Sequence, residues 1–319
     1  MGSGDIIATA RTMAVDAVTV RVVTAFRSAS IEPVVLKGPS FAAWLYGEGS
    51  LRSYVDTDLL IPPAAESAAS QVLRRLGYLP ETAMPGPVPH ATTWRHRDGG
   101  VEVDLHTRLP LTSADAETWS CLKQHTEALP LGGATVSVLD EPGKALHVVI
   151  HALQNSLSSD RANADLATAL SVAPDEVWRD AAHLAAQLGA QGAFAAGLAA
   201  SPPGVALCRR IGVDPAQPLP VTVQLLAHGA VSSGAPALAY FSQLVGWRAR
   251  LAFAGRKVLP PPSYVRSLST FGGPPSSKTM PSYAFYWLRL LRKAPGAVRA
   301  WRAARGKPSR SMRSDRIAS

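Results

Sequence analysis

Hydrophobic and polar positions follow two different periods along this chain. In the first thirty residues, apolar side chains recur at helical spacing with arginines among them, which predicts a helix. Short apolar runs bounded by glycine or proline then predict buried strands. The elements predicted in this order are a helix over 5–30, a strand over 34–36, a helix from Pro39 or Ser40 to Tyr46, a strand over 55–61 and a helix over 64–76.

A hairpin and a long helical region follow. Two apolar-polar alternations, 90–97 and 101–108, flank Asp98-Gly99-Gly100, and Asp-Gly is a strong hairpin signal. Beyond residue 112 the pattern is mainly helical, apart from a candidate hairpin near 129–139, and 260–281 is rich in Pro, Ser and Gly and is predicted to be irregular. The later predicted helices are 145–157, 162–170, 175–189 and 221–256.

This order of elements predicts an α+β protein: a small mixed-sheet domain followed by a mainly helical domain. The predicted divisions are an N-terminal helix (1–30), an α/β domain (31–140), a helical domain (141–259), an irregular segment with an amphipathic helix (260–294) and a basic, disordered tail (295–319).

Carboxylates are the most informative chemical feature. Residues i and i+2 of a strand point to the same face, so Asp56 and Asp58 are predicted to project side by side. The strand over 101–108 places Asp104 on one face together with Glu102 and His106. If Asp104 lies beside the first pair, three carboxylates surround a site for divalent cations, and hard oxygen ligands suit Mg²⁺.

An Asp-x-Asp pair alone is not specific, because two acids on an edge strand are commonly just solvated. The surroundings favour the metal site here: the strand is otherwise apolar, a glycine turn precedes it, and a second acid-bearing strand follows it.

The order and spacing of several motifs resemble a known family. They are Leu36-Lys37-Gly38, Leu45-Tyr46, Arg52, Asp56-x-Asp58-Leu59-Leu60, Leu76-Gly77-Tyr78 and Val103-Asp104-Leu105-His106. Together they look like the poorly characterised bacterial nucleotidyltransferase family of the polymerase-β superfamily. A weaker likeness continues through Asp165-Leu166 and 259–264. In one departure, Thr57 stands between the aspartates, where the family usually has an apolar residue.

The resemblance implies a polymerase-β-like nucleotidyltransferase fold. It also implies Asp56, Asp58 and Asp104 as metal ligands and catalytic residues, and Lys37-Gly38 in place of the Gly-Ser turn of better-known relatives. The cofactor is then Mg²⁺, with two ions expected and Mn²⁺ as the alternative, and the substrate is an NTP.

Several residues in and near these motifs have more than one predicted role. Lys37 suits a triphosphate, or it is a surface lysine at a strand end. Ser40 donates to phosphate or caps the following helix. Arg52 contacts phosphate or pairs with a carboxylate. Asp104 is a general base toward the acceptor or only a metal ligand, with Glu102 as the alternative third acid.

Three histidines are candidates for the site. His106 is predicted to orient groups near the site, behind the metal ligands, rather than to bind metal. His147 and His151 lie one helical turn apart, a spacing that can bind zinc, but they are predicted to be packed or solvated. No chemical role is predicted for Asp165.

The net charge of +9 is unevenly distributed. Residues 1–288 hold 22 Lys or Arg and 22 Asp or Glu, whereas the last 31 residues hold 10 Lys or Arg and one acid, Asp315. A neutral body argues against a general nucleic-acid binder, because phosphate contacts need clustered cations. Two cysteines, Cys121 and Cys208, exclude a disulfide framework. We expect a cytoplasmic protein without a signal peptide or transmembrane segment.

The C-terminal region has a basic, amphipathic pattern. A helix over 282–294, with a break at Pro295-Gly296, is predicted to carry Tyr283, Trp287, Leu290 and Leu291 on roughly one face. We expect this helix to pack its aromatic residues on the body. The alternative is that the basic segment contacts an anionic membrane or RNA.

Two functions follow. The first is an Mg²⁺-dependent enzyme that transfers a nucleoside monophosphate from an NTP to an acceptor and releases pyrophosphate. The acceptor could be a small molecule, peptide, protein or RNA. The alternative is a non-catalytic nucleotide-binding protein whose basic C-terminal tail docks on membrane or RNA.

Overall fold

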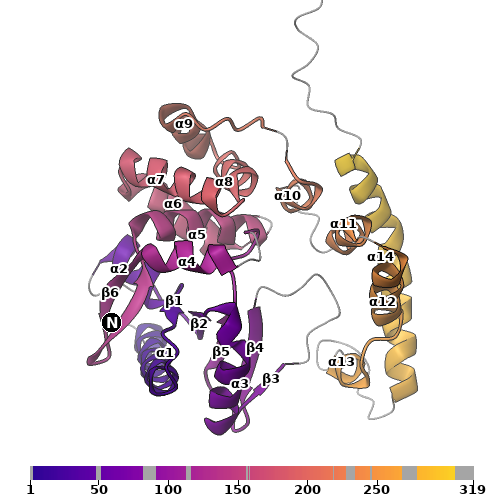
Figure 1. Cartoon of the computed structure of the whole chain (residues 1–319), viewed down its shortest axis with the longest axis horizontal. Coiled ribbons are helices and arrows are strands. Elements are labelled where there is room, and N and C mark those ends of the chain that lie inside the picture. The colour runs from indigo at the N-terminus through magenta and orange to yellow at the C-terminus, as the bar shows by residue number, and fades with distance from the viewer. Residues whose placement is uncertain are drawn as a thin grey trace, which may run out of the picture.

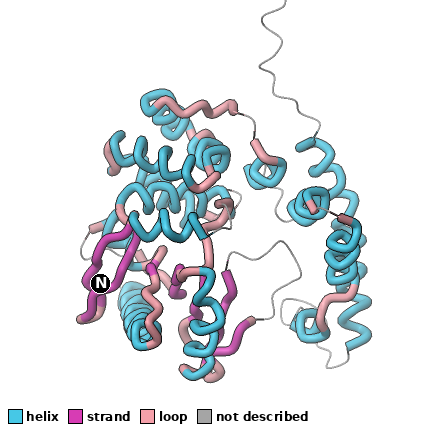
Figure 2. The backbone as a smooth tube through the Cα atoms, in the orientation of Figure 1, coloured by secondary structure: helices cyan, strands magenta, loops and turns pink. Residues whose placement is uncertain are grey.

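The computed structural model of the chain describes residues 3–47, 52–81, 91–112, 116–155, 157, 159–217, 219–227, 234–244, 246–267 and 279–305. Within this part, one mixed sheet of seven strands lies between helices (Figures 1 and 2). The strands are β1 (Val34–Val35), β2 (Asp56–Leu60), β3 (Tyr78–Pro80), β4 (Ala91–His96), β5 (Glu102–His106), β6 (Thr126–Leu131) and β7 (Ala134–Leu139).

The strand order is β3-β4-β5-β2-β1-β7-β6. The central strand β2 is antiparallel to β1 and parallel to β5, while β4 and β5 form the predicted antiparallel hairpin. The candidate hairpin near 129–139 is β6 and β7, which are antiparallel. A two-residue β1 therefore joins the two halves of the sheet, because it also pairs in parallel with β7.

Two helices cover one face of the sheet. They are α1 (Ser3–Ser28) and α3 (Glu66–Arg75), which follows a 3₁₀ turn, η1 (Pro63–Ala65). Phe26 and Leu73 pack there against Leu59 and Val103, all of them buried. Thr57 points to the same side, and its hydroxyl lies 2.9 Å from that of Thr19 in α1. The unusual Thr57 thus has a hydrogen-bonding partner away from the carboxylates.

The other face is covered by α2 (Pro39–Tyr46) and by a helical layer that Figure 1 shows on the side opposite α1 and α3. The layer consists of α4 (Ala116–Gln124), α5 (Glu141–Gln154), α6 (Asp160–Val172), α7 (Asp175–Gln187), α8 (Gln191–Leu198) and α9 (Pro202–Ile211). Helix α5 is buried along most of its length, as expected of a helix that is apolar on nearly every side. The Asp140 side chain accepts a hydrogen bond from Gly143 N and caps its first turn.

The C-terminal part contains α10 (Val221–Ala227), α11 (Ala235–Gln243), α12 (Trp247–Val258), α13 (Pro262–Ser267) and α14 (Thr279–Arg305). Figure 1 shows α11 to α14 together at the side of the body. The predicted helix over 221–256 is wrong as one element, because α10, α11 and α12 are separate helices. Helix α13 and the start of α14 lie within the stretch predicted to be irregular.

The predicted break at Pro295-Gly296 is also wrong, since α14 continues through Pro295 to Arg305. Beyond the proline, Trp301 packs with Leu225 of α10 and Ala239 of α11. This packing stabilises the helix on the far side of a residue that removes one backbone hydrogen bond. Of the predicted disordered tail, 295–305 are therefore helical, and 306–319 lie outside the described residues.

The α+β class, with a mixed sheet followed by helices, is confirmed. The domain limits, at 30, 140, 259 and 294, stay a prediction. Among the helices that the structure describes, none is both long and apolar enough to cross a membrane.

Candidate active site

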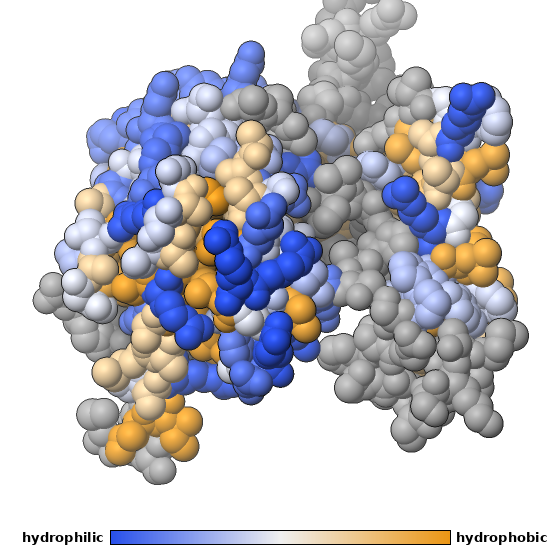
Figure 3. Space-filling view, turned by 60° about the horizontal axis from the view of Figure 1, so that its bottom comes forward, coloured by the Kyte–Doolittle hydropathy of each residue, from blue (hydrophilic) through white to orange (hydrophobic). Residues whose placement is uncertain are grey.

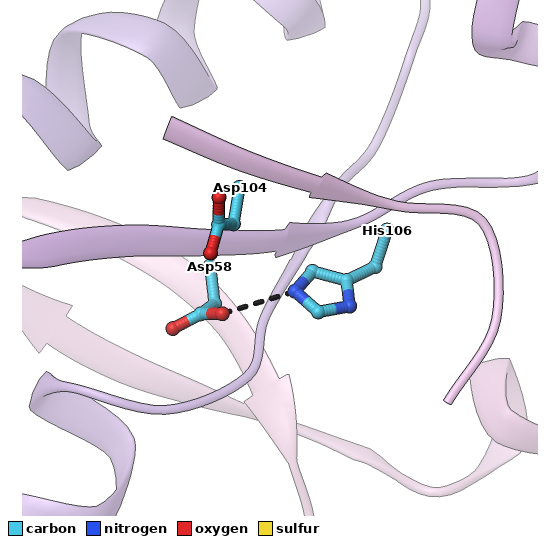
Figure 4. A group of neighbouring side chains, drawn as sticks. All are labelled: Asp58, Asp104 and His106. Carbon is cyan, nitrogen blue, oxygen red and sulfur yellow. Dashed lines mark hydrogen bonds and ion pairs between the residues drawn. The ribbon is translucent and has the colours of Figure 1, made fainter. Parts of the chain in front are cut away.

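The register of two parallel strands brings carboxylates together on one face of the sheet. Asp58 of β2 lies opposite Asp104 of β5, and Leu60 lies opposite His106. Potential ligand atoms of Asp58, Asp104 and His106 all lie within 4.8 Å of one another (Figure 4). Leu60 packs in the core formed with the helical layer, so this group faces α2 and α5 rather than α1 and α3.

Asp58 is the most enclosed member of the group. Its Oδ1 accepts from Lys37 Nζ at 2.8 Å and lies 2.9 Å from His106 Nε2. Since a carboxylate can only accept, Nε2 carries the proton in this pair. Burial by itself would raise the pKa of Asp58, but the Lys37 ammonium and His106 outweigh it and hold that pKa far below its ordinary value. Asp58 is therefore ionised, and both contacts described for it are made by Oδ1.

Lys37 responds in the opposite sense. Burial disfavours its charged form, yet Asp58, and to a lesser extent Asp56 and Asp104, raise the pKa of the ammonium above its usual value. The side chain thus faces the carboxylates as a permanent cation, which excludes the alternative of a surface lysine.

Asp104 contributes an unsatisfied oxygen. Its Oδ1 is buried and accepts no hydrogen bond within the described part of the chain. Glu102, the alternative third acid, instead pairs with Arg95 at 3.1 Å near solvent. A buried carboxylate oxygen without a donor is costly unless a cation approaches it.

Asp56 lies on the same face of β2 but is not part of the tight group. Burial, and then repulsion by Asp58, raise the pKa of its carboxyl, while Lys37 opposes the change. Asp58 and Asp104 therefore both repel the Asp56 carboxylate, and a cation bound between the three carboxylates would remove this repulsion.

The turn after β1 lies beside this group. Gly38 has a φ of 57° and precedes Pro39, the first residue of α2. A Cβ at Gly38 would lie 3.2 Å from the Tyr54 ring, so both the conformation and the space favour glycine. Ser40 is fully buried, and its Oγ forms no hydrogen bond within the described residues. Of its two predicted roles, capping of α2 is therefore wrong, since Ser40 Oγ makes no such bond among the described residues.

Arg52 joins the turn to the helical layer. Its Nε and Nη2 donate to the two carboxylate oxygens of Asp165 in α6 at 2.8 and 2.7 Å, and its Nη1 donates to Gly38 O at 3.1 Å. Tyr46 Oη donates to the same Asp165 carboxylate. Arg52 thus pairs with a carboxylate, one of its two predicted roles. Asp165, for which the sequence predicted no role, fixes the guanidinium; the weaker motif likeness at Asp165-Leu166 was the available signal.

His147 and His151 project from α5 toward the same region. His147 is buried against Phe41, with ring centroids 5.5 Å apart, and its Nδ1 forms no hydrogen bond within the described residues. Burial, and then the nearby Lys37 ammonium, lower the pKa of His147 and bring that of His151 to about 4. Both rings are therefore neutral at pH 7. No pattern in the sequence indicated that they approach Lys37.

A family model described as an uncharacterised nucleotidyltransferase matches residues 6–201, which is more than half of the chain. The chain belongs to this nucleotidyltransferase family. The resemblance inferred from the motifs is thereby confirmed, and the nucleotidyltransferase is classed as an enzyme. The matched residues include every candidate site residue described above.

Two solved structures resemble the nucleotidyltransferase weakly. One is the solution structure of the antibiotic-resistance factor ANT(2'')-Ia, with 12% identity and a TM-score of 0.42, covering 57% of this chain and 95% of that one. The other is an antigenic nucleotidyltransferase-like protein from Paracoccidioides brasiliensis, with 15% identity and a TM-score of 0.35, covering 56% and 93%. Both scores are below 0.5, so neither likeness bears on substrate. No curated protein matches the chain significantly.

The site of the nucleotidyltransferase suits a divalent cation. Oxygen ligands predominate, Asp104 has a buried oxygen with no hydrogen-bond partner among the described residues, and Lys37 and His106 both contact Oδ1 of Asp58. Asp56, Asp58 and Asp104 present three carboxyl groups to the one ammonium of Lys37, an excess of two acidic groups. This is the charge that one Mg²⁺ would balance.

Proposed function

We propose that the protein is an Mg²⁺-dependent nucleotidyltransferase that moves a nucleoside monophosphate from an NTP to an acceptor and releases pyrophosphate. The observation that most directly supports the proposal is the position of Asp104, opposite Asp58 and with a buried Oδ1 that has no partner in the described part of the chain. Mn²⁺ would serve as an alternative ion, because it also prefers oxygen ligands.

Asp56, Asp58 and Asp104 would hold one or two ions, which supply charge stabilisation on the phosphates and activate the attacking hydroxyl. His106 fixes the orientation of the Asp58 carboxylate through Nε2. Orientation matters because catalysis of phosphoryl transfer is mainly positioning and charge stabilisation.

The turn at Lys37, Gly38 and Ser40 would bind the triphosphate. The Lys37 ammonium lies at the carboxylates, Gly38 allows close backbone approach, and the buried Ser40 hydroxyl has a hydrogen to donate. Direct contact with the nucleotide phosphates was one of the two roles predicted for Arg52. With its guanidinium held by Asp165 and Gly38 O, we assign it instead to positioning this turn.

In the proposed reaction, an acceptor oxygen bonds to the α-phosphorus, and the bond from that phosphorus to the bridging oxygen of pyrophosphate breaks. The acceptor proton leaves to a base. The candidate that the geometry favours is Asp104, whose Oδ1 accepts no hydrogen bond from the residues that the structure describes. The helical layer, including His147 and His151, would line the acceptor-binding side of the site.

The decisive experiment is label transfer. The protein is incubated with each of the four NTPs labelled at the α-phosphate, with Mg²⁺ and fractionated cell extract. We expect label in one fraction, dependent on Mg²⁺ and lost in Asp104→Asn. Glu102→Gln is the matched control, because Glu102 lies on the same strand but pairs with Arg95. NTP binding without transfer to any fraction would support the non-catalytic alternative.

A further inference from the structure

The C-terminal helices carry an unusual combination of charge and exposed apolar surface. Between Asp214 and Asp315 the sequence has no Asp or Glu, yet it has 15 Lys or Arg. The acids of the chain lie almost entirely before this stretch. Opposite charges are thus segregated along the chain, and the C-terminal part has a strong positive potential.

Large apolar side chains are exposed on the same helices. On α12, Trp247, Leu251 and Val258 are 67%, 61% and 50% exposed. At about 100° per residue they lie within roughly 40° of one another, so they form one stripe. Arg248 and Arg250 flank this stripe and are exposed as well.

Helix α14 shows the same pattern. Every residue from 287 to 295 is exposed, and this run contains Trp287, three leucines and three cations but no acid. Leu291, the most exposed of these leucines, is 69% accessible. In Figure 3, orange and blue side chains lie next to one another on the right, where Figure 1 places α11 to α14.

The two helices form one surface. Trp287 Nε1 donates to Val258 O at 2.7 Å, and Tyr283 and Tyr286 donate to the carbonyls of Pro260 and Lys257. These carbonyls belong to the end of α12 and the residues after it, where carbonyls lack helical partners. The aromatic side chains therefore fix α14 against α12, and the apolar stripe of α12 continues toward the exposed run of α14.

A cavity of about 540 Å³ lies between α11, α12 and α14. It is lined mainly by apolar side chains such as Phe241, Phe253 and Leu290, and its charged lining residues are Lys257 and Lys293. An apolar space beside cations suits a molecule with a hydrocarbon chain and an anionic headgroup.

From these observations, we propose that α12 and α14 dock on the surface of an anionic lipid bilayer. Such a surface binds tryptophan at its interface, leucine toward its acyl chains and arginine at its headgroups. Single-stranded RNA would use the cations and the two tryptophans. It would leave Leu251, Leu259 and Leu291 in water, so RNA explains less of the surface.

The test is co-sedimentation of the full chain with vesicles of phosphatidylcholine, alone or mixed with phosphatidylglycerol. We expect binding to the mixed vesicles, at least about tenfold weaker binding to phosphatidylcholine alone, and weakening at raised salt. Leu251→Ser with Leu291→Ser should reduce binding by about tenfold or more. Arg256→Gln with Arg292→Gln should weaken binding only to the mixed vesicles.

Matched controls come from the other end of the chain. Ile7→Ser with Leu79→Ser removes apolar groups of α1 and β3 that are 67% and 51% exposed, and binding should not change. Equal losses in the control and test pairs would overturn the proposal. So would binding of single-stranded RNA by a chain that binds neither kind of vesicle.

Discussion

Arg52 and Asp165 form a two-pronged ion pair although they lie 113 residues apart in the chain. The side chains are 9% and 2% exposed, so the pair is withdrawn from solvent. Because Arg52 also donates to Gly38 O, the pair connects helix α6 to the turn proposed to bind phosphates. The helical layer thus helps to position the active-site turn.

Asp165→Ala should destabilise the protein strongly. Removing the carboxylate leaves a buried guanidinium without its partner, which typically costs about 3–5 kcal/mol. The free energy of unfolding, measured with urea, should fall by that amount, and label transfer should fall with it. Asp175→Ala is the control: it breaks another Arg–Asp pair with two hydrogen bonds, to Arg210, but this pair is solvent-exposed. If Asp175→Ala lowered the free energy of unfolding as much as Asp165→Ala does, this account would be contradicted.

Gly38→Ala should impair nucleotide binding more than folding. The variant introduces backbone strain of about 1–2 kcal/mol at a positive φ, and its Cβ also crowds the Tyr54 ring. Gly47→Ala is a matched control, because Gly47 has a φ of 74° but open space around its Cβ position. NTP titrations should show weaker binding in the first variant only. Equal affinities would mean that the turn does not approach the phosphates.

Lys37→Met should lower the free energy of unfolding more at pH 7 than at pH 4. In the native protein, Lys37 holds the pKa of Asp58 below its ordinary value, so Asp58 contributes stability above its unfolded pKa of about 4. That contribution is lost only as pH falls through the lower folded value. Without Lys37, buried Asp58 is poorly compensated at neutral pH, and the cost is roughly 3 kcal/mol.

The stability gap between native protein and Lys37→Met, measured without metal, should therefore be large at pH 7 and shrink toward pH 4, as Asp58 of the variant takes up a proton. Adding Asp58→Asn to Lys37→Met should restore stability at pH 7. A gap that stays constant with pH would show that the pair is not the cause.

Thr57→Val should have a small effect. It removes a hydrogen bond of 2.9 Å to Thr19, whose hydroxyl retains its bond to Val15 O, so the cost is about 1 kcal/mol. Since Thr57 points away from the carboxylates, label transfer should not change. A loss of transfer with unchanged stability would show that Thr57 has a role at the site.

The sequence predicted those parts of the site that depend on local spacing. Asp56 and Asp58 alternate along one strand, and the Asp98-Gly99 turn specifies the hairpin that carries Asp104. Local spacing could not place Asp104 opposite Asp58, because β2 and β5 are not adjacent in sequence; only the family resemblance implied that the two share a site. The role of Asp165 and the approach of His147 to Lys37 likewise depend on how the helical layer packs on the sheet.

The wrong predictions about the C-terminal helices have the same physical origin. Pro295 and Gly296 favour a helix end locally, but packing of Trp301 on α10 and α11 extends α14 past them. Tertiary contacts thus outweighed the tendency of proline and glycine to end a helix, which is among the strongest local signals in a sequence.

Mg²⁺-dependent release of pyrophosphate, measured with the extract fraction that accepts label, tests the central claim most directly. The native protein and Glu102→Gln should release pyrophosphate only when Mg²⁺ or Mn²⁺ is present, and removal of the metal with a chelator should stop it. Asp58→Asn and Asp104→Asn should each lower the rate at least about a hundredfold while the proteins remain folded. Release at the native rate by either folded variant would contradict the assignment of the carboxylate site.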